Sequence, residues 1–359
     1  MIGPARFLDI LRKDQDLWSL YTRRPEYLSA NHDAHGRYIF DSNVDGDVSI
    51  PRVSIAWKEA GYSPSYPDGK EFAIVLTHDV DILRPSIPRS LISSSRCLLD
   101  GRFKDSMRYL GWRFKGTERS PYYNFLDVMR MEEEYGAKST FFFLMKGKDF
   151  TGAGYGQDEA ATAISSIADK GWEVALHGSY KASEDLSQIL EEKRSLEKML
   201  GKRVQGYRNH YLRFRVPKTW RYLEEAGFLY DSTLGYADLF GFRNGTAHPF
   251  RPYDLEEERE MGLLEIPLAL MDCTLDRYMG LSPVLSKQAI SDMMSNVRGV
   301  KGTMVVLWHN DVLADPGSAE SAALYRYILQ QGRDQNAWLC NAEELADWWV
   351  RDEGETPCD

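Results

Sequence analysis

Residues 72–81 read FAIVLTHDVD and decide the fold class, because an apolar run typical of a buried strand ends there in two carboxylates. Side chains alternate along a strand, so Thr77, Asp79 and Asp81 share one face and His78 takes the other, structural face. Buried like charges need a cation or a proton between them. This strand end therefore favours a divalent-metal site shared with an imidazole, with a solvated strand end as the alternative.

The rest of the chain repeats the same strand-then-helix pattern. Further short buried strands are expected at 139–144, 173–179, 204–210, 229–234, 263–271, 303–310 and 337–341. Stretches with helical apolar spacing lie between most of them, at 125–135, 160–170, 186–200, 218–226, 287–297 and 319–329. Parallel strands with right-handed crossovers follow, in a (β/α) barrel or an open doubly wound sheet. Polar residues end many different strands, which favours an α/β barrel related to the TIM barrel.

Composition and charge narrow the function classes. The chain has 359 residues and a formal net charge of −10, which does not favour binding to nucleic acid. No apolar run is long enough to cross a bilayer, and the first twenty residues contain no uninterrupted signal-peptide core. The four cysteines lie far apart, as ordinary thiols in a reducing compartment would. We therefore expect a cytoplasmic protein.

Three parts of the chain are expected. Residues 1–70 form an N-terminal extension that covers the barrel bottom or mediates pairing between chains, 71–352 form the barrel, and 353–359 form a flexible tail. The first βα connection, Arg84 to Tyr122, has nine Lys or Arg against three acidic residues. Such a segment is most often a solvated surface, and its functional interpretation is a dock for a phosphate-bearing or uronate-bearing glycan precursor.

Several histidines and one arginine are the remaining candidates for chemistry. His177 ends an apolar strand, His210 follows Arg208 by two residues, and His309 abruptly ends a buried strand. One or two histidines with a carboxylate and an open position are typical of hydrolytic metal sites. The alternatives are a satisfied core histidine, simple packing of His210, and a structural ion pair for Arg208. His248 could approach the barrel mouth.

The segments THDVD, LHGSY, GYRNHY, YDST and VLWHN together resemble the polysaccharide deacetylases, which are carbohydrate esterases with the NodB-homology fold, over Phe72 to Cys340. The resemblance implies an irregular barrel of seven to eight strands. It implies that Asp79 is the general base, held by Arg208, and that Asp81 and His177 bind the metal. The backbone N–H of Tyr211 would face the oxyanion, and Leu307 and His309 match the last motif, with His309 the general acid. Further candidates are Asp231 or Asp238 to orient His309, and, for substrate contacts, Tyr180, Arg243 and Trp308.

The sequence departs from this family pattern at one position. The family's second motif usually has another metal-binding histidine four residues after the first, where this chain has Lys181, whose protonated ammonium has no lone pair. His210 supplies the missing ligand, the metal is bound weakly, or the site has lost its metal. We favour His210, because it shares the face of Arg208.

The leading hypothesis is an enzyme, a metal-dependent hydrolase that removes an N-acyl group, N-acetyl first, from an amino sugar or polysaccharide precursor. Zn²⁺ is the first choice of metal, with Ni²⁺ or Co²⁺ as alternatives. The competing hypotheses are a catalytically silent barrel that binds glycan or a protein partner, and an amidohydrolase acting on a small cyclic amide or ureide. The sequence does not predict the oligomeric state.

Overall fold

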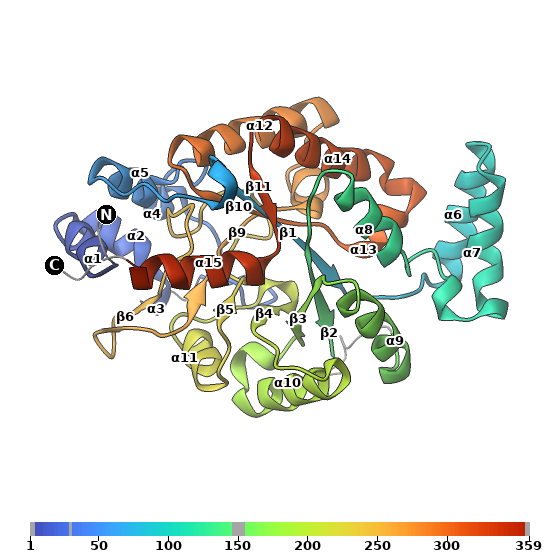
Figure 1. Cartoon of the computed structure of the whole chain (residues 1–359), viewed down its shortest axis with the longest axis horizontal. Helices are drawn as coiled ribbons and strands as arrows, with labels where there is room; N and C mark the ends of the chain where they lie inside the picture. Colours follow the sequence, from blue (N-terminus) through green and yellow to red (C-terminus); the bar gives the residue numbers. More distant parts are fainter. Residues whose placement is uncertain (1–3, 29–30, 146–154, 356–359) are drawn as a thin grey trace.

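The computed structural model of the chain describes residues 4–28, 31–145 and 155–355, and it confirms the predicted α/β barrel architecture (Figure 1). The strands form one sheet in the order β8-β5-β4-β3-β2-β1-β10-β9, with β11 also paired to β1. All pairings in this sheet are parallel. Its strands are β1 (Ala73–Val80), β2 (Thr140–Leu144), β3 (Glu173–Gly178), β4 (Gly206–Asn209), β5 (Tyr230–Asp231), β8 (Leu264–Glu265), β9 (Leu268–Met271), β10 (Thr303–Leu307) and β11 (Trp338–Cys340).

Helices surround this sheet, and those predicted between the strands are present with ends shifted by a few residues (Figure 1). These are α8 (Phe125–Glu133), α9 (Gln157–Ala168), α10 (Leu186–Leu200), α11 (Lys218–Glu225), α12 (Pro283–Gly299) and α14 (Ala319–Asp334). Helices α13 (Asn310–Ala314) and α15 (Ala342–Glu355) were not predicted. Among the described residues, no helix combines the length and the apolar character that a bilayer span requires.

Strand β1 lies at the centre and is buried along its whole length, as its apolar sequence predicts. β10 pairs along one edge of β1, whereas β11 takes the lower part and β2 the upper part of the other edge. The register continues through neighbouring strands, which sets Leu144 beside His177 and His177 beside Arg208. Because the strands are parallel, their carboxyl ends meet at one mouth of the barrel.

Two segments differ from the sequence prediction. The strand expected at 263–271 is divided into β8 and β9 around Pro267, because proline has no N–H to give to a continuous ladder. β8 and β9 end the strand order on opposite sides, so the barrel is irregular and open between them. The long connection after β1 holds two helices, α6 (Ile87–Leu99) and α7 (Phe103–Lys115).

The N-terminal segment contributes five helices, and its aromatic side chains pack with those of the barrel. They are α1 (Pro4–Arg12), α2 (Gln15–Tyr21), α3 (Arg24–Leu28), α4 (Ser42–Asp45) and α5 (Arg52–Glu59). Tyr62 contacts Trp349 of α15 with ring centroids 6.0 Å apart. His248 lies in this layer, where it is buried and bonds Ser54 and the backbone oxygen of Lys301, just before β10 begins. His248 is therefore at the bottom of the barrel, and the expectation that it approaches the mouth was wrong.

The C-terminal segment that was predicted as a tail is described only in part. Residues 353–355, expected in the tail, belong to α15, and residues 356–359 lie outside the described residues, as does Cys358. The other three cysteines are free thiols.

Candidate active site

Three potential metal ligands converge at the mouth of the barrel. Asp81 follows β1, His177 lies near the end of β3, and His210 follows β4 directly, and their ligand atoms all lie within 4.8 Å of one another. His177 Nε2 is 3.3 Å from Asp81 Oδ1, and His210 Nε2 is 3.5 Å from Asp81 Oδ2. Ligand bonds of 2.0–2.1 Å in a tetrahedron place donor atoms about 3.3–3.4 Å apart, so these separations fit a zinc-type ion.

The hydrogen bonds around the cluster leave ligand lone pairs facing its centre. The backbone oxygen of Arg208 accepts a hydrogen bond from His177 Nδ1 at 3.0 Å, which leaves Nε2 as the free nitrogen. Among the described residues, buried Asp81 Oδ1 and His177 Nε2 have no hydrogen-bond partner. The residues present therefore fit a divalent cation. Lys181 is exposed, and His210 takes the place beside Asp81 that the sequence pattern left open.

The charges of the cluster agree with this fit. Burial acts to raise the pKa of Asp81, but the neighbouring imidazoles of His177 and His210 hold it well below its usual range. Burial acts to lower the pKa of His177, yet the carboxylates of Asp79 and Asp81 raise it. A carboxylate that stays ionised beside imidazoles that attract positive charge is the electrostatic setting of a cation site.

Asp79 and Arg208 form a buried ion pair next to the three ligands. Arg208 Nη1 donates to Asp79 Oδ1 at 3.1 Å and to Thr77 Oγ1 at 2.7 Å, and Nε donates to the backbone oxygen of Ser232 at 2.9 Å. The other Asp79 oxygen, Oδ2, is 3.5 Å from His177 Nε2. The guanidinium therefore fixes one carboxylate oxygen and leaves the second facing the cluster.

His309 lies on the other side of Asp81 and is held by Asp272. His309 Nδ1 is 3.0 Å from Asp272 Oδ1, the backbone N–H of His309 donates to Oδ2 at 2.8 Å, and Nε2 is 3.9 Å from Asp81 Oδ2. Burial acts to lower the pKa of His309, but the charge of Asp272 and its hydrogen bond raise it well above the ordinary value. His309 is thus kept as an imidazolium with Nε2 toward the cavity.

The structure corrects the expected partner of His309. Asp231 is buried in β5, where Thr233 donates a hydrogen bond to it and Glu265 is its register partner in β8. Burial raises the pKa of Asp231 to about 6. Burial also raises the pKa of Glu265 well above its usual range, and the nearby charge of Asp231 adds to this effect. Asp238 is exposed. Asp272 takes the role that the sequence assigned to Asp231 or Asp238, because β9 pairs beside β10.

Two expected substrate contacts are structural instead. Arg243 is fully buried and bonds both carboxylate oxygens of Glu26, at 2.6 and 3.0 Å, which links the N-terminal segment to the barrel. Trp308 points away from the mouth into the core, where its Nε1 donates to Ser321. Neither side chain reaches the cavity, so both expectations were wrong.

Tyr180 and Tyr211 lie at the outer rim. Tyr211 is half exposed and has a left-handed backbone (φ 63°) two residues after β4, where the chain turns at the mouth. Tyr180 contacts Tyr211 edge-on, with ring centroids 5.4 Å apart, and its hydroxyl is 3.1 Å from His35 Nδ1. Arg37 donates to the backbone oxygen of Tyr211 at 3.3 Å. The N-terminal segment therefore contributes His35 and Arg37 to the rim.

The sequence interpretation missed Asp272 and Arg37. Asp272 could have been found by the same pattern as Asp79, because each is a carboxylate at the end of an apolar run. No local pattern distinguishes Arg37 from other loop arginines. Both line a cavity of about 330 Å³ together with Asp79, His177 and His309. This volume is at the low end of small-molecule pockets.

The fold of this chain is similar to that of a solved protein provisionally assigned as a polysaccharide deacetylase, which confirms the resemblance in fold predicted from the sequence. A provisionally assigned polysaccharide deacetylase from Mycobacterium smegmatis matches at a TM-score of 0.55 and 23% identity, covering 83% of this chain and 96% of that one.

Two weaker likenesses carry no argument about this chain. A CE4 family pseudoenzyme from Bacillus anthracis matches at a TM-score of 0.40 and 14% identity, covering 79% of this chain and 67% of that one. The peptidoglycan deacetylase PdaC from Bacillus subtilis matches at 0.35 and 13%, covering 81% and 96%. No protein-family model and no curated protein sequence matches the chain.

Proposed function

We propose that this protein is a metal-dependent hydrolase that removes an N-acyl group, N-acetyl first, from an amino sugar or polysaccharide precursor. One observation carries the proposal. The ligand cluster of Asp81, His177 and His210 lies within 4 Å of both an arginine-held carboxylate, Asp79, and an aspartate-held imidazole, His309. A base and an acid on either side of an open cation site are what amide hydrolysis requires. The cytoplasmic location expected from the sequence is part of this proposal.

Asp81, His177 and His210 would hold the metal, with Zn²⁺ as the first choice and Ni²⁺ or Co²⁺ as alternatives. When bound, such an ion lowers the pKa of a water molecule toward ~7 and polarises an amide carbonyl. The oxygen and nitrogen donors of this set suit all three ions.

The chain's own residues would perform the proton transfers. The free oxygen of Asp79 accepts the proton of the attacking water, while Arg208 keeps the carboxylate ionised and oriented. The backbone N–H of Tyr211 is the proposed donor to the oxyanion, because the left-handed turn brings this residue to the cavity. His309, kept cationic by Asp272, gives its proton to the departing amine.

The first experiment separates this proposal from a silent barrel. The purified full chain is analysed for Zn²⁺, Ni²⁺ and Co²⁺, and then assayed on N-acetylated amino sugars with the metal restored. Asp79→Asn is expected to keep the metal and to lose at least about 100-fold in turnover. His210→Ala is expected to lose the metal, whereas His32→Ala, a histidine outside the cavity, is the matched control and should keep both.

Three results would contradict the proposal or one of its assignments. A chain with no affinity for any of the three ions would support the silent barrel. Activity on small ureides with none on acetylated amino sugars would support the amidohydrolase instead. Full turnover by Asp79→Asn would show that the assigned base is wrong.

A further inference from the structure

Helices α6 and α7 form a hairpin that stands apart from the barrel. Figure 1 shows the two helices side by side at the right-hand end of the molecule, joined by a short turn. The hairpin begins at Ile87, six residues after Asp81, so one end of it lies beside the mouth of the barrel. Each helix has 13 residues.

The polarity of this hairpin is inverted. Its buried positions include several serines, and Ser94 and Ser106 bond each other across the two helices at 2.7 Å. Ser93 donates to Asp315 of the barrel, and Tyr109 donates to the backbone oxygen of Ala314 at 3.0 Å. Polar contacts therefore supply much of the attachment to the barrel, beside a small buried cluster of Cys97, Tyr109 and Tyr122, where soluble helices ordinarily bury a continuous apolar stripe.

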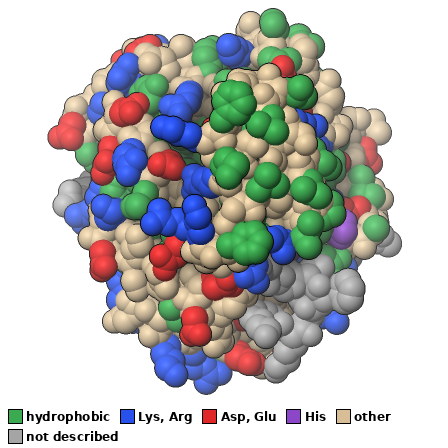
Figure 2. Space-filling model, turned by 90° about the vertical axis from the view of Figure 1, so that its right-hand side faces the viewer, with side chains coloured by type: hydrophobic (Ala, Val, Ile, Leu, Met, Phe, Trp, Pro, Cys, Tyr) green, Lys and Arg blue, Asp and Glu red, His purple; other side chains and the backbone are tan. Residues whose placement is uncertain are grey.

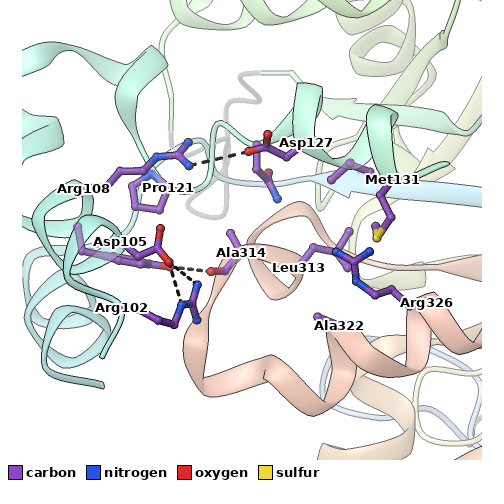
Figure 3. A pocket seen from close by; sticks show the side chains of 13 residues that line it. Arg102, Asp105, Arg108, Pro121, Asp127, Met131, Leu313, Ala314, Ala322 and Arg326 are labelled. Carbon is purple, nitrogen blue, oxygen red and sulfur yellow. Dashed lines mark hydrogen bonds and ion pairs between the residues drawn. The ribbon is translucent and has the colours of Figure 1, made fainter. Parts of the chain in front are cut away.

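Figure 3 shows the side of α7 that faces the barrel. The side chains there are largely charged, with ion pairs of Arg102 with Asp105 and of Arg108 with Asp127 beside a cavity of about 230 Å³. Charged residues thus line much of this side of the hairpin. Most of its large aliphatic side chains and both of its phenylalanines are exposed, on the face turned away from the barrel.

That outward face of the hairpin is apolar along its length. On α7, residues 103, 107, 110 and 114 follow the spacing of a single helical face, and Phe103, Met107 and Phe114 are 67%, 68% and 91% exposed. On α6, Leu91, Leu98 and Leu99 are also exposed. Nine of the 17 exposed large hydrophobic residues in the described part of the chain belong to these two helices. Figure 2 shows these side chains gathered on one face.

The charge of the hairpin is opposite to that of the whole chain. Residues 87–115 contain seven Lys or Arg and two Asp, a local net charge of +5, whereas the whole chain has −10. Figure 2 shows Lys and Arg side chains bordering the apolar surface. A helix with exposed large apolar side chains and flanking basic residues has the composition of an interfacial membrane helix. At 13 residues each helix is shorter than the ~20 of a bilayer span.

We propose that the outward face of the α6–α7 hairpin docks on the surface of an anionic lipid bilayer and inserts its apolar side chains at the headgroup level. Charge complementarity selects this occupant, because the hairpin that exposes the apolar side chains has a local net charge of +5, and an anionic bilayer surface attracts such a segment. A symmetric dimer through this face would set two hairpins of net charge +5 against each other, and like-charge repulsion disfavours that arrangement.

A cleft of about 790 Å³ connects the hairpin to the metal ligands. It is lined by Arg84, Arg89 and Arg113 on the hairpin side and by Arg277 on the rim, and it shares Arg277 with the cavity that holds the cluster. Arg84 and Arg89 pair with carboxylates. Among the described residues, the structure records no carboxylate partner for Arg113 or Arg277, which leaves both cations available to an anion.

The position of this cleft indicates a substrate class for the hydrolase, and this inference rests on the proposed function. Two unpaired arginines between a membrane-docked hairpin and an N-acyl hydrolase site suit a phosphate that joins an amino sugar to a membrane lipid. The lipid stays in the bilayer, its phosphate contacts Arg113 and Arg277, and the N-acyl sugar reaches the ligand cluster.

The docking is tested by co-flotation of the full chain with phosphatidylcholine vesicles that contain or lack phosphatidylglycerol. Binding is expected with the anionic vesicles and should weaken as salt is added. The double variant Leu99→Ser and Phe114→Ser removes two exposed side chains and should weaken binding by about 100-fold. Its matched control, Val44→Ser with Ile50→Ser, removes two exposed apolar residues from the N-terminal segment and should bind like wild type.

Other results would overturn the docking proposal. Equal loss in both double variants would mean that the hairpin is not the docking face. Absence of vesicle binding, together with a dimer that Leu99→Ser and Phe114→Ser converts to monomer in sedimentation velocity, would show that a second copy covers the face. Thermal unfolding of each variant checks that the chain remains folded.

The substrate class is tested with two substrates, an N-acetyl amino sugar linked to a lipid phosphate and the same sugar without the lipid phosphate. Arg113→Gln with Arg277→Gln should lower kcat/KM on a lipid-phosphate-linked N-acetyl amino sugar at least 10-fold more than it lowers kcat/KM on the free N-acetyl amino sugar. Turnover of the free sugar alone would refute the substrate class and keep the proposed function. Turnover of neither substrate would refute the proposed function, whereas the vesicle result would still stand.

Discussion

Replacing Asp272 by Asn should lower the pKa of His309 in the metal-free protein. Asp272 places a carboxylate oxygen 3.0 Å from His309 Nδ1, and this charge raises the pKa of the imidazole against the burial that acts to lower it. Asn keeps the size and an oxygen that can accept the backbone N–H of His309. The variant therefore removes the charge and keeps most of the geometry.

The distance gives the expected size of the change. Two unit charges about 4 Å apart interact by about 4 kcal/mol at an effective dielectric constant near 20, which corresponds to roughly 3 pKa units. The His309 side chain is 20% exposed, so water screens part of this interaction. We expect the pKa of His309 to fall by about 1 to 2 units.

The assay is an NMR titration of the imidazole nitrogens in wild type, Asp272→Asn and Asp238→Asn. Asp238 is the exposed aspartate that sequence alone offered as the partner, and Asp238→Asn should leave the titration unchanged. In the active enzyme, the alkaline limb of kcat/KM should move to lower pH in Asp272→Asn, because the imidazolium is lost earlier. An unchanged pKa in Asp272→Asn, or an equal fall in Asp238→Asn, would refute the assignment of Asp272.

The remaining predictions concern stability and metal affinity. Arg243→Met should lower the free energy of unfolding in urea by about 1.5 to 3 kcal/mol, because the buried Glu26 would lose one of its two arginine partners and keep only Arg23; a change below about 0.5 kcal/mol would contradict this role. Burial, and then the charge of Glu343, raise the pKa of Glu173 from 4.5 to about 7. The folded state therefore takes up a proton, and wild-type stability should fall by roughly 3 kcal/mol as pH rises from about 4.5 to about 7. Glu173→Gln should flatten this part of the curve of denaturation midpoint against pH, and an unaltered curve would refute the assignment. In competition with a chelator, His210→Ala should weaken Zn²⁺ binding by at least about 100-fold, since loss of even an outer partner costs 10–100-fold; unchanged affinity would remove His210 from the ligand set.

The buried parallel strands and the central cluster could be anticipated because they depend on local patterns. The ten residues 72–81 contain an apolar run, which predicts a buried strand, and the two aspartates Asp79 and Asp81, which predict a polar strand end. Parallel topology then brings the other strand ends to the same mouth, so His177 and His210 meet Asp81 without further information. The sequence could not supply the distances, which depend on the register between strands.

The partner of His309 depended on a long-range pairing. Leu307 of β10 pairs with Met271 of β9, which sets Asp272 against His309 across 37 positions of sequence. The weak, two-residue strand β5 directed the prediction to Asp231 instead, and β5 turns that side chain toward Glu265. Alternation along β10 also separates Trp308 from Leu307 and His309, which is why Trp308 lies in the core.

The α6–α7 hairpin was missed as a structural element for a different reason. Its segment was noticed for its basic residues, and its apolar residues at helical spacing were not interpreted. In a soluble helix that spacing marks the face packed on the core. Here the same spacing marks the outward face, with Phe103 and Phe114 exposed and Ser94 buried. Only the three-dimensional arrangement reveals this inversion.

The central claim is that one cation is held by Asp81, His177 and His210. An anomalous difference map from a crystal soaked with Zn²⁺ tests it most directly. The account predicts one strong peak about 2.0–2.2 Å from a carboxylate oxygen of Asp81, from His177 Nε2 and from a ring nitrogen of His210. A peak that His210 does not touch, or no peak at this mouth when zinc is saturating, would contradict it.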